Sequence, residues 1–203
     1  MKIGVFCSAN SNISHSFFSA TEEFGRWIGK SGHSLVWGGC SLGLMDTIGR
    51  SFIEGRNILK KERGFSPSGS QIGAAAVSGA TQKEGLLIGI VPEIIEEKGK
   101  VFSPLDVLVG CRNLSDRKDI IIEKSDILIA LPGGIGTLDE IFTAASSSTI
   151  GYHKKKTILY NIDGFWTPLI LLMDHLEKEG MTRGTYRDKI IEAKSLDDIK
   201  KYI

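Results

Sequence analysis

Short apolar runs alternate with longer stretches of helical periodicity along most of this chain. Runs of mainly apolar, partly β-branched residues are typical of buried parallel strands. Such runs predict strands at Ile3–Cys7, Ser34–Trp37, Leu86–Val91, Val107–Val109, Asp126–Leu131 and Thr157–Asn161. Lys189–Ala193 is expected to form either a further strand or a short turn.

The stretches between these runs place apolar residues three and four positions apart, as a helix with one buried face requires. They predict helices at Phe17–Gly29, Leu44–Lys61, Ser115–Lys124, Leu138–Ser147, Trp166–Glu179 and Leu196–Ile203. Strands that alternate with helices predict an α/β fold, in which a doubly wound parallel sheet carries helices on both faces. Ligands of such sheets bind beyond the carboxyl ends of the strands.

We expect residues 1–203 to form a single domain. This length is enough for one substantial core, and no internal repeat is visible. Residues 64–85 depart from the pattern because they are rich in Gly, Ser and Ala and have little periodicity. We expect this segment to be a flexible surface loop or an insertion, with a lid over the site as the alternative.

Composition and charge narrow the class of protein. The net charge of +1 gives no reason to expect a nucleic-acid partner, and no apolar stretch is long enough to span a membrane. The chain enters a strand directly, without a signal-peptide pattern. Three widely spaced cysteines, Cys7, Cys40 and Cys111, favour reduced thiols in the cytoplasm over a disulfide framework. The four histidines lack metal-ligand spacing, so we expect no metal.

The most informative segment is 132–140, which reads Pro-Gly-Gly-Ile-Gly-Thr-Leu-Asp-Glu between a predicted strand and a predicted helix. Its glycines lack a Cβ, so the backbone N–H groups can approach a bound anion closely. The helix dipole and the hydroxyl of Thr137 add to this attraction. The turn therefore suits a phosphate, and Glu140 would face the sugar of a nucleotide bound there.

This segment allows interpretations other than a phosphate site. A tight structural turn, with a glutamate that only complements the helix dipole, is one alternative. The G-x-x-x-x-G-K-[ST] pattern is absent and no G-x-G-x-x-G lies near the first strand, so neither a P-loop NTPase nor an ordinary NAD site is expected. A second glycine-rich turn, residues 38–43, also follows a strand and therefore lies at the same edge of the sheet.

Arg117 and Lys118 fall in the first turn of the helix predicted at 115–124. The helix dipole disfavours cations there, so a bound anion would offset the cost. Arg117 can hold phosphate or ribose oxygens through its planar fork, and Lys118 supplies a point charge. The alternative is a solvated face on which both residues pair with Asp116 or Asp119.

An acidic group, Glu140, and a basic group, Arg117, on either side of a bound phosphoribosyl group suggest cleavage of its N-glycosidic bond. That cleavage builds positive charge on the sugar, as glycoside hydrolysis does. The carboxylate of Glu140 could stabilise this charge and orient water, while Arg117 fixes the ribose phosphate or assists the departing base.

These motifs resemble those of the LOG ("lonely guy") family. Residues 132–140 resemble its PGGxGTxxE signature, and Arg117-Lys118, about fifteen residues earlier, fits its second basic element. Residues 38–45 look like its GGGxxGLMG turn, and residues 88–92 like its central GVIP strand. The resemblance covers nearly the whole chain.

The resemblance implies a Rossmann-like homodimer that hydrolyses AMP or an N6-substituted AMP (a cytokinin nucleotide) to the free base and ribose 5-phosphate. It implies that Arg117 and Glu140 are catalytic. The expected contacts of the substrate and its phosphate are Gly133, Gly134, Gly136, Thr137, Lys118, Asp139, Gly39 and Gly43. No cofactor is expected: members are often labelled possible lysine decarboxylases, but the sequence offers no convincing site for a pyridoxal lysine.

Three features depart from the family pattern and concern the base more than the hydrolytic chemistry. Asp46 stands where the family has glycine, Leu114 replaces a methionine, and the segment 64–85 is longer than expected. Two other classes stay open: a non-catalytic nucleotide-binding or sensing protein, and a carrier of another phosphorylated small molecule, such as the molybdenum-cofactor carriers that resemble this fold. Arg117 and Glu140 together favour the enzyme, because a pure binder does not need both.

Overall fold

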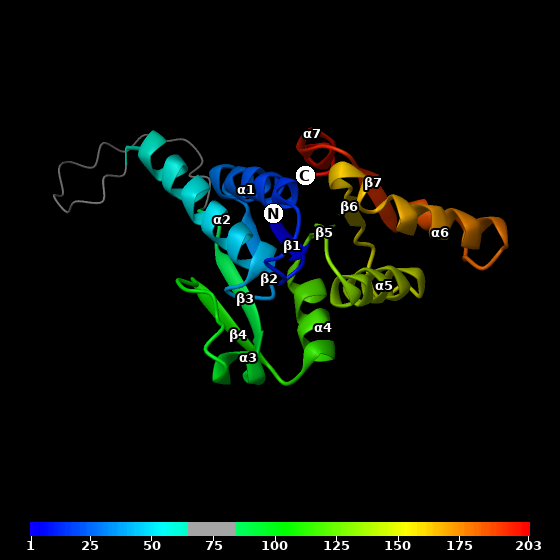
Figure 1. The fold of residues 1–203 in the computed structure, drawn as a ribbon, viewed down its shortest axis with the longest axis horizontal. Helices are drawn as coiled ribbons and strands as arrows, with labels where there is room; N and C mark the ends of the chain where they lie inside the picture. The colour runs from blue at the N-terminus through cyan, green and yellow to red at the C-terminus, as the bar shows by residue number, and fades with distance from the viewer. Residues whose placement is uncertain (65–83) are drawn as a thin grey trace.

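The computed structural model describes residues 1–64 and 84–203 (Figure 1). The strands of these residues are β1 (Lys2–Phe6), β2 (Ser34–Trp37), β3 (Leu87–Pro92), β4 (Val107–Cys111), β5 (Ile127–Ala130), β6 (Thr157–Tyr160) and β7 (Ile190–Ala193). The helices are α1 (His15–Lys30), α2 (Gly43–Glu62), α3 (Glu93–Glu97), α4 (Leu114–Lys124), α5 (Ile135–Thr149), α6 (Thr167–Lys178) and α7 (Leu196–Lys200). Two short 3-10 helices, η1 (Ile162–Gly164) and η2 (Tyr186–Asp188), precede and follow α6.

The described strands form one seven-stranded sheet in the order β4-β3-β2-β1-β5-β6-β7, and every pair is parallel. Successive strand residues face opposite layers. In β1, for example, Ile3 and Val5 pack into one hydrophobic cluster and Phe6 packs into another. Burial on both faces explains why these strands read as continuous apolar runs in the sequence.

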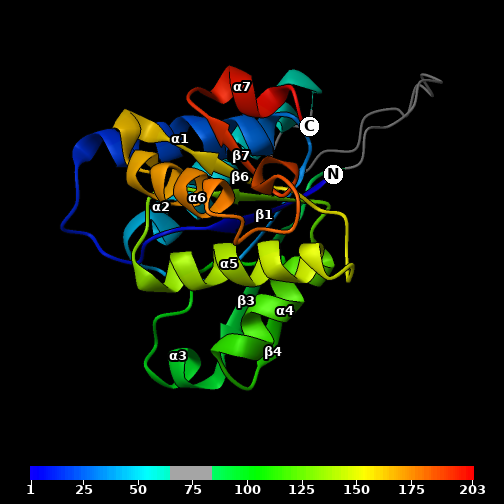
Figure 2. The same cartoon turned by 90° about the vertical axis from the view of Figure 1, so that its right-hand side faces the viewer.

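Helices cover both faces of the sheet, as Figure 2 shows from the side. Helices α1, α2 and α7 contribute to the cluster on one face, and α4, α5 and α6 contribute to the two clusters on the other. The chain therefore forms one Rossmann-like α/β domain, and the predicted fold class is confirmed.

Several boundaries differ from the predicted ones. Helix α5 begins at Ile135 and not at Leu138, because the weak helix propensity of Gly136 hid its first turn. The last helix ends at Lys200, after which Ile203 packs partly buried against the core. Helix α3 was not predicted, since its five residues are too few to show a period and none is buried.

Two further predictions have different outcomes. The segment 189–193, left open between strand and turn, forms strand β7 from Ile190 onward. The loop or insertion predicted at 64–85 falls almost wholly outside the described residues, so it stays a prediction.

The strand order reverses between β1 and β5, because β2 to β4 lie on one side of β1 and β5 to β7 on the other. The segments that follow β1, β2 and β5 meet at this point. The N–H of Ser8 donates to the carbonyl of Pro132 (3.2 Å), and the N–H of Leu44 donates to the carbonyl of Ser8 (3.0 Å). Crevices at such switch points are the usual ligand sites of open α/β sheets.

Candidate functional site

A cavity of about 240 Å³ lies at this switch point. It is enclosed by the segments after β1, β2 and β5, together with side chains from α3, α4 and α5. Its lining residues are Cys7, Ser8, Ala9, Cys40, Met45, Ile95, Arg117, Gly134, Gly136, Thr137 and Glu140. Five of the predicted site residues thus line one cavity: Arg117 from α4, and Gly134, Gly136, Thr137 and Glu140 from α5 and its N-cap.

The N-terminus of α5 forms one wall of the cavity. Gly134 is its N-cap, no side chain caps the helix, and the first turn holds no acidic residue. A Cβ on Gly134 or Gly136 would meet no atom of the described residues within 4 Å, so the backbone there is open to a ligand. Thr137 is buried and also lines the cavity. Unpaired first-turn N–H groups and the helix dipole make this wall attractive to an anion.

Arg117 reaches the cavity from the first turn of α4. The side chain of Asn113 caps that helix by accepting a hydrogen bond from the N–H of Asp116 (3.0 Å). The guanidinium Nη2 of Arg117 donates to Oε1 of Glu140 (3.2 Å), whereas its buried Nε has no partner among the described residues. A buried N–H without a partner is costly, so this donor is available for a bound anion.

Glu140 is almost fully buried, at 4% exposure. Burial raises the pKa of its carboxyl group to about 7, against the opposing effect of the Arg117 guanidinium. Desolvation disfavours the charged carboxylate, and the nearby cation recovers part of that cost. The group can therefore exchange its proton near neutral pH, which is the behaviour expected of a catalytic acid or base.

Lys118 and Asp139, two more predicted contacts, pair with each other outside the cavity lining. The Nζ of Lys118 donates to Oδ2 of Asp139 at 2.6 Å. The basic pair of α4 therefore faces α5, and the alternative of a solvated face paired with Asp116 or Asp119 was wrong: Asp116 instead accepts from Arg112.

The other three predicted glycines shape the loops and do not line the cavity. Gly39 and Gly43 have φ angles of +60° and +53°, which residues with a side chain rarely adopt. A Cβ on Gly43 would also lie 2.6 Å from backbone atoms of Ala9 and Asn10. Gly133 leaves room for the hydroxyl of Thr137. Whether any of them touches a phosphate stays a prediction.

The structure adds residues that the sequence did not single out for the site. Cys7 lines the cavity, and burial, then Glu140, raises the pKa of its thiol well above the ordinary value, so it stays protonated. Gly38 makes room for Arg117, because a Cβ there would lie 3.2 Å from its Nη1. Their positions could have indicated a place in the site, because Cys7 and Gly38 each come directly after a strand, at the edge of the sheet where ligands bind.

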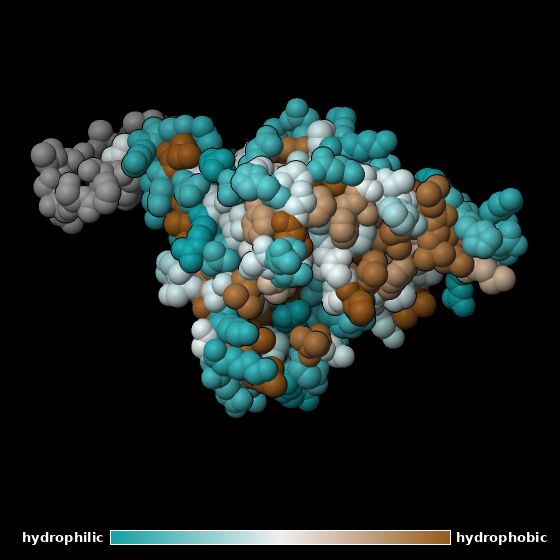
Figure 3. All heavy atoms as spheres, viewed as in Figure 1, coloured by the Kyte–Doolittle hydropathy of each residue, from teal (hydrophilic) through white to brown (hydrophobic). Residues whose placement is uncertain are grey.

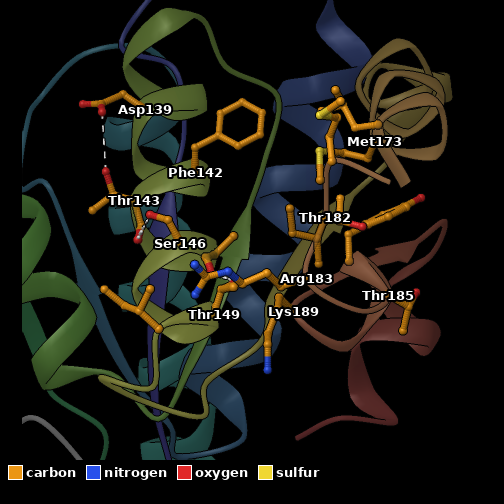
Figure 4. A pocket seen from close by; sticks show the side chains of 16 residues that line it. Asp139, Phe142, Thr143, Ser146, Thr149, Met173, Thr182, Arg183, Thr185 and Lys189 are labelled. Carbon is orange, nitrogen blue, oxygen red and sulfur yellow. Dashed lines mark hydrogen bonds between the residues drawn. The ribbon is translucent and has the colours of Figure 1, made fainter. Parts of the chain in front are cut away.

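A larger groove of about 600 Å³ lies on the other side of α5 (Figure 4). It runs between α5 and the end of α6 with the segment that leads into β7. Asp139, Phe142, Met173 and Met181 are among its lining residues. Glu140 faces the smaller cavity and Asp139 lines the groove, so consecutive residues of α5 serve two different surfaces.

Residues 1–64 and 84–203 contain no group of three or more His, Cys, Asp or Glu side chains that could hold a metal ion. No helix within those residues combines the length and the apolar character that crossing a bilayer requires.

The fold and the cavity together define a class, the Rossmann-like α/β proteins with a cavity at the switch point of the sheet. Residues 73–203 match the sequence profile of the family described as "Possible lysine decarboxylase". Relatives named phosphoribohydrolase align with nearly the whole chain. The chain belongs to this family, the LOG family, and the predicted resemblance is confirmed.

Three relatives illustrate the similarity. The cytokinin riboside 5′-monophosphate phosphoribohydrolase of Rhodococcoides fascians is 29% identical over 199 residues, which cover 96% of this chain and 85% of that protein. A probable enzyme of the same name from Oryza sativa subsp. japonica is 27% identical and covers 98% and 76%. One from Arabidopsis thaliana is 26% identical and covers 98% and 80%.

Solved structures with the same fold include two proteins with different names. The molybdenum cofactor carrier protein of Chlamydomonas reinhardtii has a TM-score of 0.64 and 18% identity, and the match covers 99% of this chain and 94% of that one. The molybdenum cofactor binding protein of Rippkaea orientalis has a TM-score of 0.62, 18% identity, and coverage of 99% and 93%. At this identity the likeness shows the fold alone.

Proposed function

We propose that this protein is a nucleoside 5′-monophosphate phosphoribohydrolase that acts on AMP or an N6-substituted AMP. The observation that carries the proposal is the buried pair of Arg117 and Glu140 beside the uncapped N-terminus of α5. An anion-binding helix end, a cation with a free buried donor and a carboxyl group that titrates near neutrality are the groups this hydrolysis needs. Distant homology to LOG phosphoribohydrolases supports a hydrolase.

In the proposed reaction the 5′-phosphate binds the first turn of α5, where the backbone at Gly134 and Gly136 is open. Water adds to the anomeric carbon of the ribose, the carbon–nitrogen bond breaks, and the base leaves with that electron pair and a proton. The ionised Glu140 stabilises the positive charge that develops on the sugar and orients the water. Arg117 holds phosphate or ribose oxygens or assists the departing base.

A second candidate function is carriage or sensing of a phosphorylated small molecule without catalysis. The uncapped N-terminus of α5 and the unpartnered Nε of Arg117 favour this candidate, because both suit phosphate binding without catalysis. A carrier needs the anion-binding wall and Arg117, but it gains nothing from a buried carboxyl group that repels phosphate when ionised. Glu140 is therefore the residue that separates the two candidates.

The surface and the cysteines of the protein bear on its assembly and its location. We propose a homodimer, because Figure 3 shows hydrophobic residues gathered over α5 and α6, and Phe142, Ile150 and Met181 are exposed along the groove there. The aromatic residues of α1 pack against the core and offer no such face. A cytoplasmic location fits three buried, unpaired cysteines.

The experiment that tests the function compares base release by three forms of the protein. Purified wild type, Glu140→Gln and the exposed control Glu123→Gln are incubated with AMP and with isopentenyl-AMP, and free base and ribose 5-phosphate are measured by chromatography. We expect release by wild type and Glu123→Gln, and a loss of about a hundredfold or more in Glu140→Gln. The ratio of the two rates then gives the base preference.

Two results would contradict the proposal. Nucleotide that binds wild type and is never cleaved would leave a binding or sensing protein. Failure of wild type to bind either nucleotide would favour a carrier of another phosphorylated molecule.

A further inference from the structure

Helices α4 and α5 are joined by two adjacent ion pairs. Arg117 Nη2 lies 3.2 Å from Glu140 Oε1, and Lys118 Nζ lies 2.6 Å from Asp139 Oδ2. Consecutive residues of one helix thus pair with consecutive residues of the other. The first pair lines the cavity at the switch point, and neither member of the second pair does.

Lys118 and Asp139 hold each other in a defined geometry. The side chain of Lys118 is only 12% exposed, whereas that of Asp139 is 55% exposed. The second oxygen of Asp139 accepts from the hydroxyl of Thr143 on the next turn of α5 (3.5 Å). The ammonium group is therefore drawn away from the cavity and toward the groove that Asp139 lines. An ammonium group that is paired with a carboxylate in this way attracts a phosphate only weakly.

The first turn of α4 needs such an anchor. The buried residues of α4 are Ile121 and Ile122, both in its second half, and Leu114 at its start is 60% exposed. Apolar burial therefore fixes the end of the helix and not the turn that carries Arg117. Within the described residues, the side-chain links from this turn to α5 are the two ion pairs.

We propose that Lys118 and Asp139 form a positioning pair, which holds the first turn of α4 against α5 and so keeps Arg117 beside Glu140. This inference rests on the proposed function, because positioning matters only if Arg117 and Glu140 act on a substrate. When a bound phosphate competes for the guanidinium, the contact between Arg117 and Glu140 weakens. The Lys118–Asp139 pair then keeps the helix in place. It acts on turnover through Arg117 and does not contact the phosphate.

The kinetic test uses Lys118→Met, Asp139→Asn and the double variant with the charges exchanged, Lys118→Asp with Asp139→Lys. Lys124→Met and Asp119→Asn are controls, because both residues are exposed on α4 and have no ion pair among the described residues. With AMP as substrate, we expect each single variant to lower kcat about fivefold or more with KM little changed, and the exchanged pair to recover most of the loss. A role in phosphate binding predicts the opposite: Lys118→Met raises KM, Asp139→Asn does not, and the exchange rescues nothing.

The pH profile gives a readout that a merely structural role would not move. Glu140 is faced by Arg117 and Lys118 from α4, by Asp139 from its own helix and by Cys7 after β1. Lys118 lowers the pKa of Glu140 and Asp139 raises it. Direct charge effects alone would therefore move the acidic limb of kcat in opposite directions, to higher pH in Lys118→Met and to lower pH in Asp139→Asn. Displacement of Arg117, which lowers the pKa of Glu140 more strongly, should move the limb to higher pH in both variants. Opposite shifts, or no shift in either variant, would overturn the positioning role.

Amide hydrogen exchange separates failure of this inference from failure of the proposed function. It is measured without nucleotide on wild type and the same variants. We expect faster exchange at residues 114–118 in Lys118→Met and Asp139→Asn, with exchange at Ile121 and Ile122 unchanged. If wild type releases no base and exchange still rises there, the proposed function fails and the anchoring stands. Unchanged exchange in both variants overturns the inference whatever the activity.

Discussion

At the scale of single residues, the site depends on the environment of one carboxyl group. Glu140 lies in the second turn of α5, close to its N-terminal end, where an exposed glutamate would simply complement the helix dipole. Here it is buried against Arg117, and burial raises its pKa to about 7. The same residue type at the same helix position thus becomes a group that titrates near neutral pH.

Burial of Glu140 has a consequence for stability that needs no substrate. Its pKa is higher in the folded protein than in the unfolded chain, so the folded state retains a proton that the unfolded state has lost. The stability that this proton contributes is fully present below about pH 4 and is lost as pH rises through about 7. Glu140→Gln stays neutral, so its stability relative to wild type should rise between pH 5 and pH 8, by about 3 kcal/mol at most.

The measurement is urea unfolding of the nucleotide-free proteins at constant ionic strength. Glu123→Gln serves as the control, because Glu123 is exposed and its difference from wild type should not vary with pH in this way. Parallel stability curves for wild type and Glu140→Gln would contradict the prediction.

The sequence predicted which residues form the site better than it predicted the contacts between them. Arg117, Gly134, Gly136, Thr137 and Glu140 were predicted, and they line one cavity. Glycines and charges at helix ends carry a local signal that a sequence can show. The pairing of Lys118 with Asp139 and the burial of Cys7 against Glu140 depend on how α4, α5 and β1 pack, and no local pattern encodes that packing.

At the scale of secondary-structure elements, glycines bring two helices unusually close. Gly25 and Gly29 of α1 face α2, and Gly55 of α2 faces α1. A Cβ on Gly29 would lie 2.1 Å from the carbonyl oxygen of Phe52, and one on Gly55 would lie 2.0 Å from that of Arg26. Backbone atoms cannot move aside as the end of a side chain can. The apolar pattern predicted both helices, but not that these glycines form their interface.

This close approach predicts a destabilised Gly55→Ala variant. Alanine is the better helix former, so propensity alone would stabilise α2. The clash with Arg26 should outweigh that gain and cost about 1–3 kcal/mol, as overpacking usually does. Thermal unfolding measures the effect, with Gly110→Ala as control, because a Cβ at Gly110 would meet no described atom within 4 Å. A melting temperature for Gly55→Ala equal to or above that of wild type would show that α1 and α2 separate easily.

At the scale of the whole molecule, topology was the most predictable property. Alternating strands and helices specify a parallel sheet with crossover helices, and such a sheet brings the segments after β1, β2 and β5 to one edge. The surface was much less predictable. Both α1 and α5 carry aromatic residues at helical spacing, yet those of α1 pack against the core and Phe142 of α5 is exposed beside a groove.

The exposed face over α5 and α6 predicts how the proposed homodimer forms. Phe142 is 38% exposed and Met181 is 74% exposed, and both line the groove of about 600 Å³. A second copy that covers this groove would bury their apolar surface, and a charge placed there would oppose association. We expect light scattering to show a dimer for wild type at micromolar concentration and a folded monomer for Phe142→Glu. Leu108→Glu is the control, because Leu108 is 45% exposed on β4 at the edge of the sheet. Helix α5 instead follows β5, which lies in the interior of the sheet.

Dimerisation through this groove should also affect the site. Asp139 lines the groove and pairs with Lys118, so a covering subunit would shield that ion pair from water and strengthen it. The monomeric Phe142→Glu variant should therefore release base more slowly than wild type, although Phe142 does not line the smaller cavity. Base release is measured with AMP at protein concentrations on both sides of the dimer dissociation constant, and wild-type activity per subunit should fall on dilution. A monomeric wild type, or a dimer that survives Phe142→Glu and dissociates in Leu108→Glu, would place the interface elsewhere and remove this link between assembly and activity.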